Sequence, residues 1–220
     1  MTIAALITAA GSGTRFGARK QFLDLVPGLR LVDAAVETCR QVADWVGVLV
    51  PADHTWEGPP VDLVAVGGDS RQATLLRGLA ALPSGADRVL IHSASHPLAT
   101  VGLAAAAVAA LDDGADAAVP LWTPADVIKD GRGTGLVTVG REGFGLAQSP
   151  MAFRRHAIVE AFAAGREAVE ESALVEADGG VVRAVPGEVT NVHVIDPLTL
   201  DMARALLPVL AAGAPTGRTQ

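Results

Sequence analysis

Short apolar runs along the chain alternate with longer segments in which apolar residues recur at helical spacing. The runs predict strands over residues 3–7, 45–50, 61–66, 88–92 and 116–120. The spaced segments predict helices over residues 31–43, 71–82 and 98–112. Strands that alternate with helices indicate a Rossmann-like α/β fold, a mostly parallel sheet flanked by helices. Ligands of such sheets bind beyond the carboxyl ends of the strands.

The turn after the first predicted strand, residues 9–22, reads AAGSGTRFGARKQF and is rich in glycine. Glycines let backbone N–H groups approach a ligand, and Arg15 and Lys20 add fixed positive charge. The stretch lacks the Gly-Lys pair of a Walker A loop, and its third glycine comes one residue too late for the dinucleotide-binding fingerprint. It therefore predicts a nucleoside triphosphate site, with a plain glycine-rich turn as the alternative.

Residues 121–150 break the alternation of strands and helices. This stretch has many glycines and only short β-type runs at 127–128 and 136–139. We expect an extended β arm inserted in one domain that spans residues 1–220. Such an arm is poorly stable alone, so a second copy of the chain is the expected partner. Beyond the arm, the pattern predicts helices over 151–164 and 197–210, strands over 181–185 and 191–195, and Asp196 as an N-cap.

Composition narrows the class of protein. The formal net charge is −7 and the chain has no basic run, which argues against nucleic acid or an anionic membrane as partner. The start lacks the positive segment of a signal peptide, and the apolar stretch 98–111 is too short to span a bilayer. Cys39 is the single cysteine, so no disulfide framework or cysteine-based zinc site is expected. These features favour a cytoplasmic protein.

Several ordered segments carry a family resemblance. They are AAGSGTRFG with KQF, GGDSRQAT, VLIHSASHP, ADVIKD, REGFGLAQSPMAF, SALVEADGG and NVHVIDPLTLDMA. Through them the chain resembles the 2-C-methyl-D-erythritol 4-phosphate cytidylyltransferase family over nearly its whole length, and it is similar to the ribitol-phosphate cytidylyltransferases. The resemblance implies transfer of CMP from CTP to a small phosphorylated or phosphonylated polyol-like acceptor, with release of pyrophosphate and with Mg²⁺ as cofactor.

The resemblance also implies roles for individual residues, carried over position by position. The nucleotide-binding residues would be Ala9, Ala10, Gly11, Ser12, Gly13, Gly68, Asp69, Arg71, Thr74 and Ser93. The catalytic residues would be Arg15, Lys20, Arg141 and His193. The acceptor would contact His96, Val127, Arg141 and His193, with Arg141 reaching it across a homodimer.

Departures from the family pattern gather in the acceptor half. Ser93 replaces an Asp tied to metal and nucleotide, and His96 replaces an Arg. Val127 replaces a Thr, and His193 replaces a catalytic Lys. A hydroxyl is a weaker Mg²⁺ ligand than a carboxylate, so the metal ligands are unassigned. The acceptor is therefore methylerythritol 4-phosphate or a different compound. The alternative function is a nucleotide-binding homologue that has lost turnover and acts as a regulatory or partner protein.

Two single residues have a structural interpretation beside the functional one. Asp69 is placed where it could cap the helix that begins near residue 71. His92 follows an apolar strand and is more typical of a hydrogen-bonded core histidine than of a catalyst.

Overall fold

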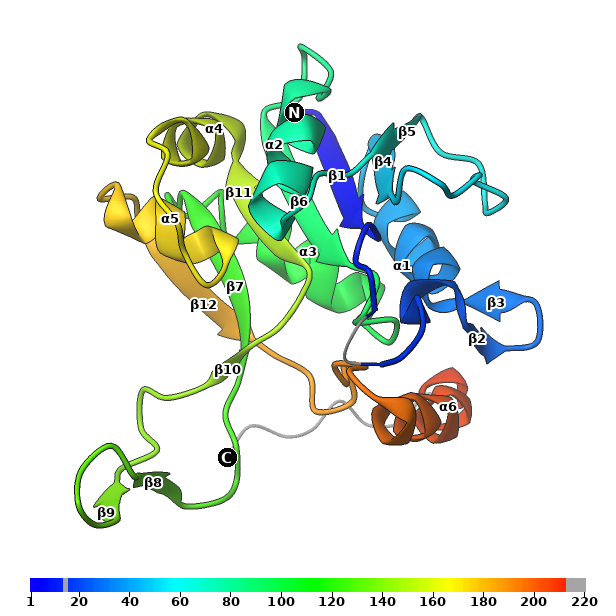
Figure 1. Ribbon diagram of the computed structural model, residues 1–220. Helices are drawn as coiled ribbons and strands as arrows, with labels where there is room; N and C mark the ends of the chain where they lie inside the picture. The colour runs from blue at the N-terminus through cyan, green and yellow to red at the C-terminus, as the bar shows by residue number, and fades with distance from the viewer. Residues whose placement is uncertain (14–15, 213–220) are drawn as a thin grey trace.

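The computed structural model describes residues 1–13 and 16–212. Its main sheet has the order β10-β7-β11-β6-β1-β4-β5, and β12 pairs with β7 outside this path. The strands are β1 (Ile3–Thr8), β4 (Trp45–Val50), β5 (Leu63–Val66), β6 (Arg88–Ser93), β7 (Ala117–Trp122), β10 (Leu146–Ala147), β11 (Met151–Arg154) and β12 (Val182–Pro186). Most pairings in it are parallel, which confirms the expected α/β fold (Figure 1).

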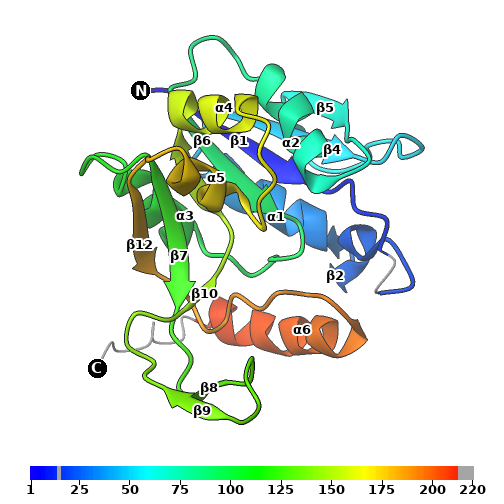
Figure 2. The ribbon, with the colours of Figure 1, turned by 60° about the vertical axis from the view of Figure 1, so that its left-hand side comes forward.

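Helices cover both faces of this sheet because its strands are apolar on both sides. They are α1 (Leu31–Arg40), α2 (Arg71–Ala80), α3 (Val101–Ala109), α4 (Arg155–Ala163) and α5 (Glu171–Ala177), whereas α6 (Pro197–Ala211) packs beside the sheet. Ala5 and Ile7 of β1 pack with α1 and α3, whereas Ala4 and Leu6 pack with α2, α4 and α5. Figure 2 shows these helices around the sheet. Alternate side chains of one strand thus serve two cores.

A third apolar cluster lies beside the sheet, where the C-terminal helix α6 packs against residues near the start of the chain. Leu200 and Ala203 of α6 pack there with Leu25, from the short hairpin of β2 (Asp24–Val26) and β3 (Leu29–Arg30). Asp196 caps α6, as predicted, because its carboxylate accepts the Thr199 N–H at 2.8 Å. This packing carries the segment before α6 toward the carboxyl ends of the strands.

Two expectations about secondary structure are wrong, each for a tertiary reason, and one helix was not foreseen. Residues 151–154 form antiparallel strand β11 between β6 and β7, whereas the pattern predicts helix there. The apolar run Met-Ala-Phe is too short for periodicity to distinguish strand from helix, and pairing with β6 and β7 decides in favour of a strand. Residues 191–195 form no strand; there the Val194 N–H donates to the Ser95 carbonyl at 2.8 Å. Helix α5 is not predicted.

The arm is joined to the main sheet at its ends, where β10 pairs with β7, and its middle stands apart. Within it, β8 (Ile128–Asp130) and β9 (Val137–Val139) pair as an antiparallel hairpin. Both views show this hairpin projecting from the body of the molecule (Figures 1 and 2). Leu136 is 75 % exposed, and Val137 and Phe144 are also exposed. Among the described residues, no helix has the length and apolar content needed to cross a membrane.

Candidate active site

A cavity of about 550 Å³ opens at the carboxyl ends of the parallel strands. Strand register explains its position, because Thr8 at the end of β1 pairs with Ser93 at the end of β6 and with Leu49 of β4. Its lining comes from four separate segments. The lining residues are Thr8, Ala9, Ala10, Gly11, Ser12, Gly13, Phe16, Lys20, Gln21, Gly68, Asp69, Ser70, Arg71, Thr74, Ser93, Ser95, His193 and Ile195.

The side chain of Gln21 fixes the conformation of the loop after β1. Gln21 is buried, and its Nε2 donates to the carbonyl oxygens of Ala9 and Gly11, both at 2.8 Å. Gly13 has φ +72°, and a Cβ there would lie 1.8 Å from the Ala18 carbonyl oxygen, so only glycine fits. Turning these carbonyls toward Gln21 leaves the loop suited to offer N–H groups to an anion.

A second loop, residues 67–70, forms the facing wall between β5 and α2. A Cβ on Gly67 would lie 2.3 Å from the Ala10 Cβ, so the two loops can approach only because residue 67 is glycine. The Gly68 N–H donates to Thr74 Oγ1 at 3.0 Å. Ser70, not Asp69, caps α2, since its Oγ accepts the Ala73 N–H at 3.0 Å. Asp69 instead lines the cavity.

Two cationic side chains line the cavity on different walls. Lys20 begins the short 3₁₀ turn Lys20–Phe22, and its Nζ donates to the Val194 carbonyl oxygen. Arg71, the first residue of α2, pairs with Glu171 of α5. Burial lowers the pKa of Arg71, but the hydrogen bond and the charge of Glu171 outweigh it and raise that pKa above its ordinary value. Arg15 lies outside the described residues.

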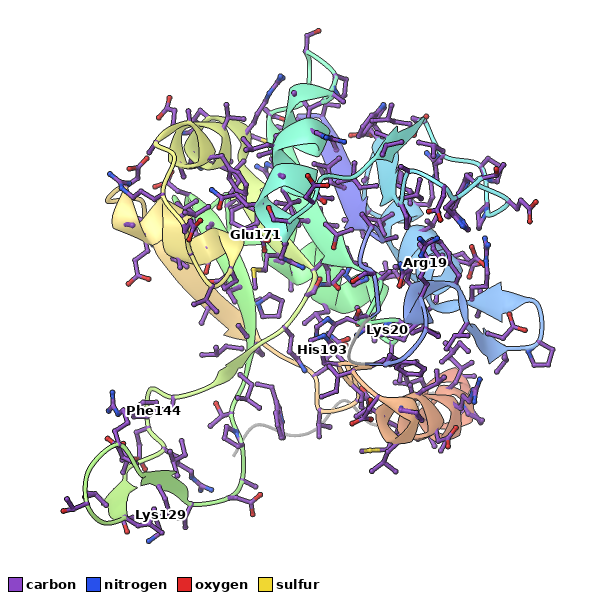
Figure 3. The ribbon with its side chains drawn as sticks, in the orientation of Figure 1. Arg19, Lys20, Lys129, Phe144, Glu171 and His193 are labelled. Carbon is purple, nitrogen blue, oxygen red and sulfur yellow. The ribbon has the colours of Figure 1, made fainter. Side chains whose placement is uncertain are left out.

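Two histidines replace the expected cations on the acceptor side. His193 lines the cavity, and its ring stacks on that of His96 with centroids 4.5 Å apart and an angle of 17°. His96 is only 8 % exposed and lies outside the lining. Burial, and then the positive charge of His193 and other neighbouring cations, hold the pKa of His96 well below 6.5. His96 is therefore neutral at pH 7. His193 and Lys20, both labelled in Figure 3, line the same cavity.

His92 has the structural environment of a core histidine. It is fully buried, and its Nδ1 lies 2.8 Å from Ser149 Oγ. That hydroxyl also accepts the Ser93 N–H at 2.8 Å, so His92 supports the backbone at the end of β6. Burial lowers the pKa of His92 to about 3, which keeps the ring neutral. The Ser93 hydroxyl faces the Ser95 N–H at 3.3 Å.

The predicted arm residues are not part of this cavity. Val127 is 66 % exposed, and Arg141 is also exposed, with its Nη1 donating to the Ala125 carbonyl oxygen at 2.8 Å. One chain thus brings together the ten predicted nucleotide-binding residues with Lys20 and His193, and leaves Val127 and Arg141 elsewhere.

Sequence reasoning missed two residues that organise the site, Gln21 and Glu171. Gln21 stands inside the KQF signature, and its position beside Lys20 was the available signal. For Glu171 the signal was weaker, because the helix that presents it was not predicted. Among the described residues no cluster of three or more His, Cys, Asp or Glu side chains could hold a metal ion, and Asp69 is the one carboxylate in the lining.

The chain is similar to known proteins over nearly its whole length. Residues 3–208 match the family model described as 2-C-methyl-D-erythritol 4-phosphate cytidylyltransferase. An enzyme of that name from Rubrobacter xylanophilus is 37 % identical over 92 % of this chain and 94 % of its own length. A relative from Anaeromyxobacter sp., named bifunctional enzyme IspD/IspF, is 39 % identical over 93 % of this chain. The match spans 57 % of that longer relative.

Solved structures give the same result. The crystal structure of 2-C-methyl-D-erythritol 4-phosphate cytidylyltransferase from Thermus thermophilus is similar with a TM-score of 0.79 and 33 % identity. That likeness covers 94 % of this chain and 98 % of the other.

Proposed function

The chain belongs to the 2-C-methyl-D-erythritol 4-phosphate cytidylyltransferase family, and on that premise we propose that it moves the cytidylyl group of CTP onto a small phosphorylated polyol. Methylerythritol 4-phosphate is the first acceptor to test. The observation that carries the proposal is the joint lining of one cavity by the glycine-rich loop, the 67–70 loop, Lys20 and His193.

The chemistry needs no nucleophile from the protein. A phosphate oxygen of the acceptor attacks the α-phosphorus of CTP, and the bond from that phosphorus to the bridging oxygen breaks as pyrophosphate leaves. The protein contributes position and positive charge, as in other phosphoryl-type transfers. Backbone amides of residues 9–13 would bind the triphosphate, and Lys20 would offset the charge that grows on the α-phosphate and pyrophosphate. Arg15 is proposed to assist Lys20.

Mg²⁺ is proposed as the cofactor, and the donor set fits an ion that the nucleotide brings with it. Mg²⁺ commonly uses one or two carboxylates together with substrate phosphates and water. Among the described residues the lining offers the Asp69 carboxylate and the hydroxyl groups of Ser12 and Ser93. When bound, the ion would neutralise phosphate charge; the residues named here would orient it.

The acceptor is proposed to bind near His193, on the side of the cavity where His96 supports its ring. A neutral imidazole can donate one hydrogen bond, and a protonated one can also attract a phosphate. We propose further that a second copy of the chain packs on the arm, so that Arg141 and Val127 reach the acceptor of the other subunit. A CTP-dependent reaction of this kind is proposed to occur in the cytoplasm.

The test is a pyrophosphate-release assay with CTP, Mg²⁺ and a panel of phosphorylated or phosphonylated polyols. Turnover with methylerythritol 4-phosphate is the expected result. Turnover with another acceptor only would keep the reaction class and change the substrate. CTP binding without turnover across the panel would overturn the proposal and favour the regulatory alternative. Thermal-shift measurements with the four nucleoside triphosphates check that CTP binds best.

A further inference from the structure

Glu171 contacts the nucleotide cavity only through another side chain. Its carboxylate receives two hydrogen bonds from the guanidinium of Arg71, from Nε at 2.6 Å and from Nη2 at 2.9 Å. The Glu171 side chain is 3 % exposed, whereas that of Arg71 is 48 % exposed and lines the cavity. A buried carboxylate therefore holds a partly exposed guanidinium at the wall of the site (Figure 3 labels Glu171).

The stability of α2 does not favour an arginine at its first residue. The N-terminus of a helix is the positive end of its dipole, so it repels a cation on the first residue and attracts an anion there. Arg71 and Glu171 are those first residues of α2 and α5. Glu171 thus offsets an arrangement that α2 alone would disfavour, which indicates that Arg71 is kept at this place for a ligand.

Further hydrogen bonds near the Arg71–Glu171 ion pair fix the start of α5 relative to α2. Glu170 caps α5 by accepting the N–H groups of Ser172 at 2.8 Å and Ala173 at 3.0 Å. On the other side, Gln72 Nε2 donates to the Arg166 carbonyl oxygen at 2.7 Å. These bonds fix where α5 begins relative to α2, so the carboxylate of Glu171 reaches Arg71 in one geometry.

Pairing changes what Arg71 can recognise. Guanidinium has five N–H donors, and Glu171 uses two, so three stay available for a ligand. The carboxylate also cancels the positive charge, so the pair donates directed hydrogen bonds without a net attraction for phosphate. Such a group suits uncharged acceptors, the oxygen and nitrogen atoms of a pyrimidine base or a ribose. Lys20, on the opposite wall, supplies the charge that phosphates require.

We propose that Glu171 is a positioning residue that orients Arg71 toward the nucleoside part of CTP. The inference rests on the proposed function for the identity of the nucleotide. It assigns the two ends of the ligand to different walls, the phosphates to the glycine-rich loop and Lys20, and the nucleoside to the Arg71–Glu171 pair.

The test compares Glu171→Gln with Glu176→Gln, a matched change at an exposed residue of the same helix. Binding is measured by calorimetry with CTP, CMP and inorganic tripolyphosphate, and kinetics by pyrophosphate release. In Glu171→Gln we expect the Kd for CTP and for CMP to rise about tenfold, as for a loss of about 1.4 kcal/mol. The Kd for tripolyphosphate should stay within twofold of wild type, and KM for CTP should rise more than kcat falls.

Equal weakening of CMP and tripolyphosphate, or CMP binding as tight as in Glu176→Gln, would overturn the assignment. If Glu171→Gln lowers the melting temperature too far for binding work, Arg71→Lys serves instead, because it keeps the charge and loses the fork of donors. Arg71→Lys should give the same selective loss, and tight CMP binding there would also overturn it. Because binding is read without turnover, an inactive wild type would contradict the proposed function and leave this result standing.

Discussion

The nucleotide cavity and the arm differ in where their order comes from. At the cavity, buried side chains hold the walls in place: Gln21 binds the backbone of its own loop, and Glu171 binds Arg71 from a segment far away in sequence. On the arm, Leu136, Val137 and Phe144 are exposed, and Arg141 bonds to a carbonyl of the arm itself. The contrast teaches that one chain brings together the predicted nucleotide-binding residues, while the arm residues that we propose for the acceptor stay exposed.

Replacing Lys20 by Ala is the strongest test of the cavity side. We expect kcat/KM to fall ~10²–10³-fold, the size of effect seen when a single group that stabilises transition-state charge is removed. The measurement is pyrophosphate release, with melting temperature as the check on folding. Arg19→Ala is the control, because Arg19 pairs with Asp53 at 2.9 Å outside the cavity lining and should change the rate less than twofold. Unchanged turnover in Lys20→Ala would remove Lys20 from the mechanism.

Replacing Phe144 by Asp tests the arm side. A charge on this exposed apolar residue should prevent burial against a second copy, so sedimentation should shift from dimer to monomer at micromolar concentration. Acceptor KM should rise about tenfold and the Kd for CTP should not change. Val209→Asp, at an exposed apolar site on α6, is the control. A wild-type monomer, or a Phe144→Asp dimer with normal acceptor KM, would contradict the proposed role of the arm.

Replacing Gln21 by Leu sharpens the contrast by loosening the cavity loop without touching charge. The buried carbonyl of Ala9 would lose its donor, at a cost of about 1–3 kcal/mol in unfolding free energy, and the more exposed carbonyl of Gly11 would lose the same donor. KM for CTP should rise about tenfold with a smaller change in kcat. Urea denaturation and steady-state kinetics measure the two effects. Gln41→Leu, on the exposed end of α1, should show neither; a similar loss there would mean that the effect is not specific to the loop.

A last test changes pH in place of ligand binding or turnover, and it concerns a buried histidine at the end of β6, beside the cavity. The pKa of His92 is about 3 in the folded chain and ordinarily 6.5, so below pH 6.5 only the unfolded chain takes up the proton. Stability is complete above about pH 6.5 and falls by ~1.4 kcal/mol per pH unit toward pH 3 for such a group. His92→Asn should flatten this fall in denaturation series from pH 7 to 4. His156→Asn, at an exposed histidine, should not.

Local patterns account for most of the fold and for the nucleotide half of the site. The strand over residues 45–50 and the cap at Asp196 are found where apolar runs and a capping residue predict them. The glycine-rich loop is equally local, because the need for glycine at residue 13 arises from its own turn. Such features depend on neighbours a few positions away, which a single sequence displays directly.

Tertiary structure decided the features that depend on distant partners. Residues 151–154 became a strand because they fill the place between β6 and β7. Arg71 and Glu171 stand 100 positions apart, and His96 supports His193 across a similar separation. The sequence by itself thus determined the fold class, the family and the glycine-rich loop that lines the cavity. The packing of remote segments determined which side chains support the cavity, such as Glu171 and His96. Burial and ion pairing act through space, so they produce no periodic pattern along the chain.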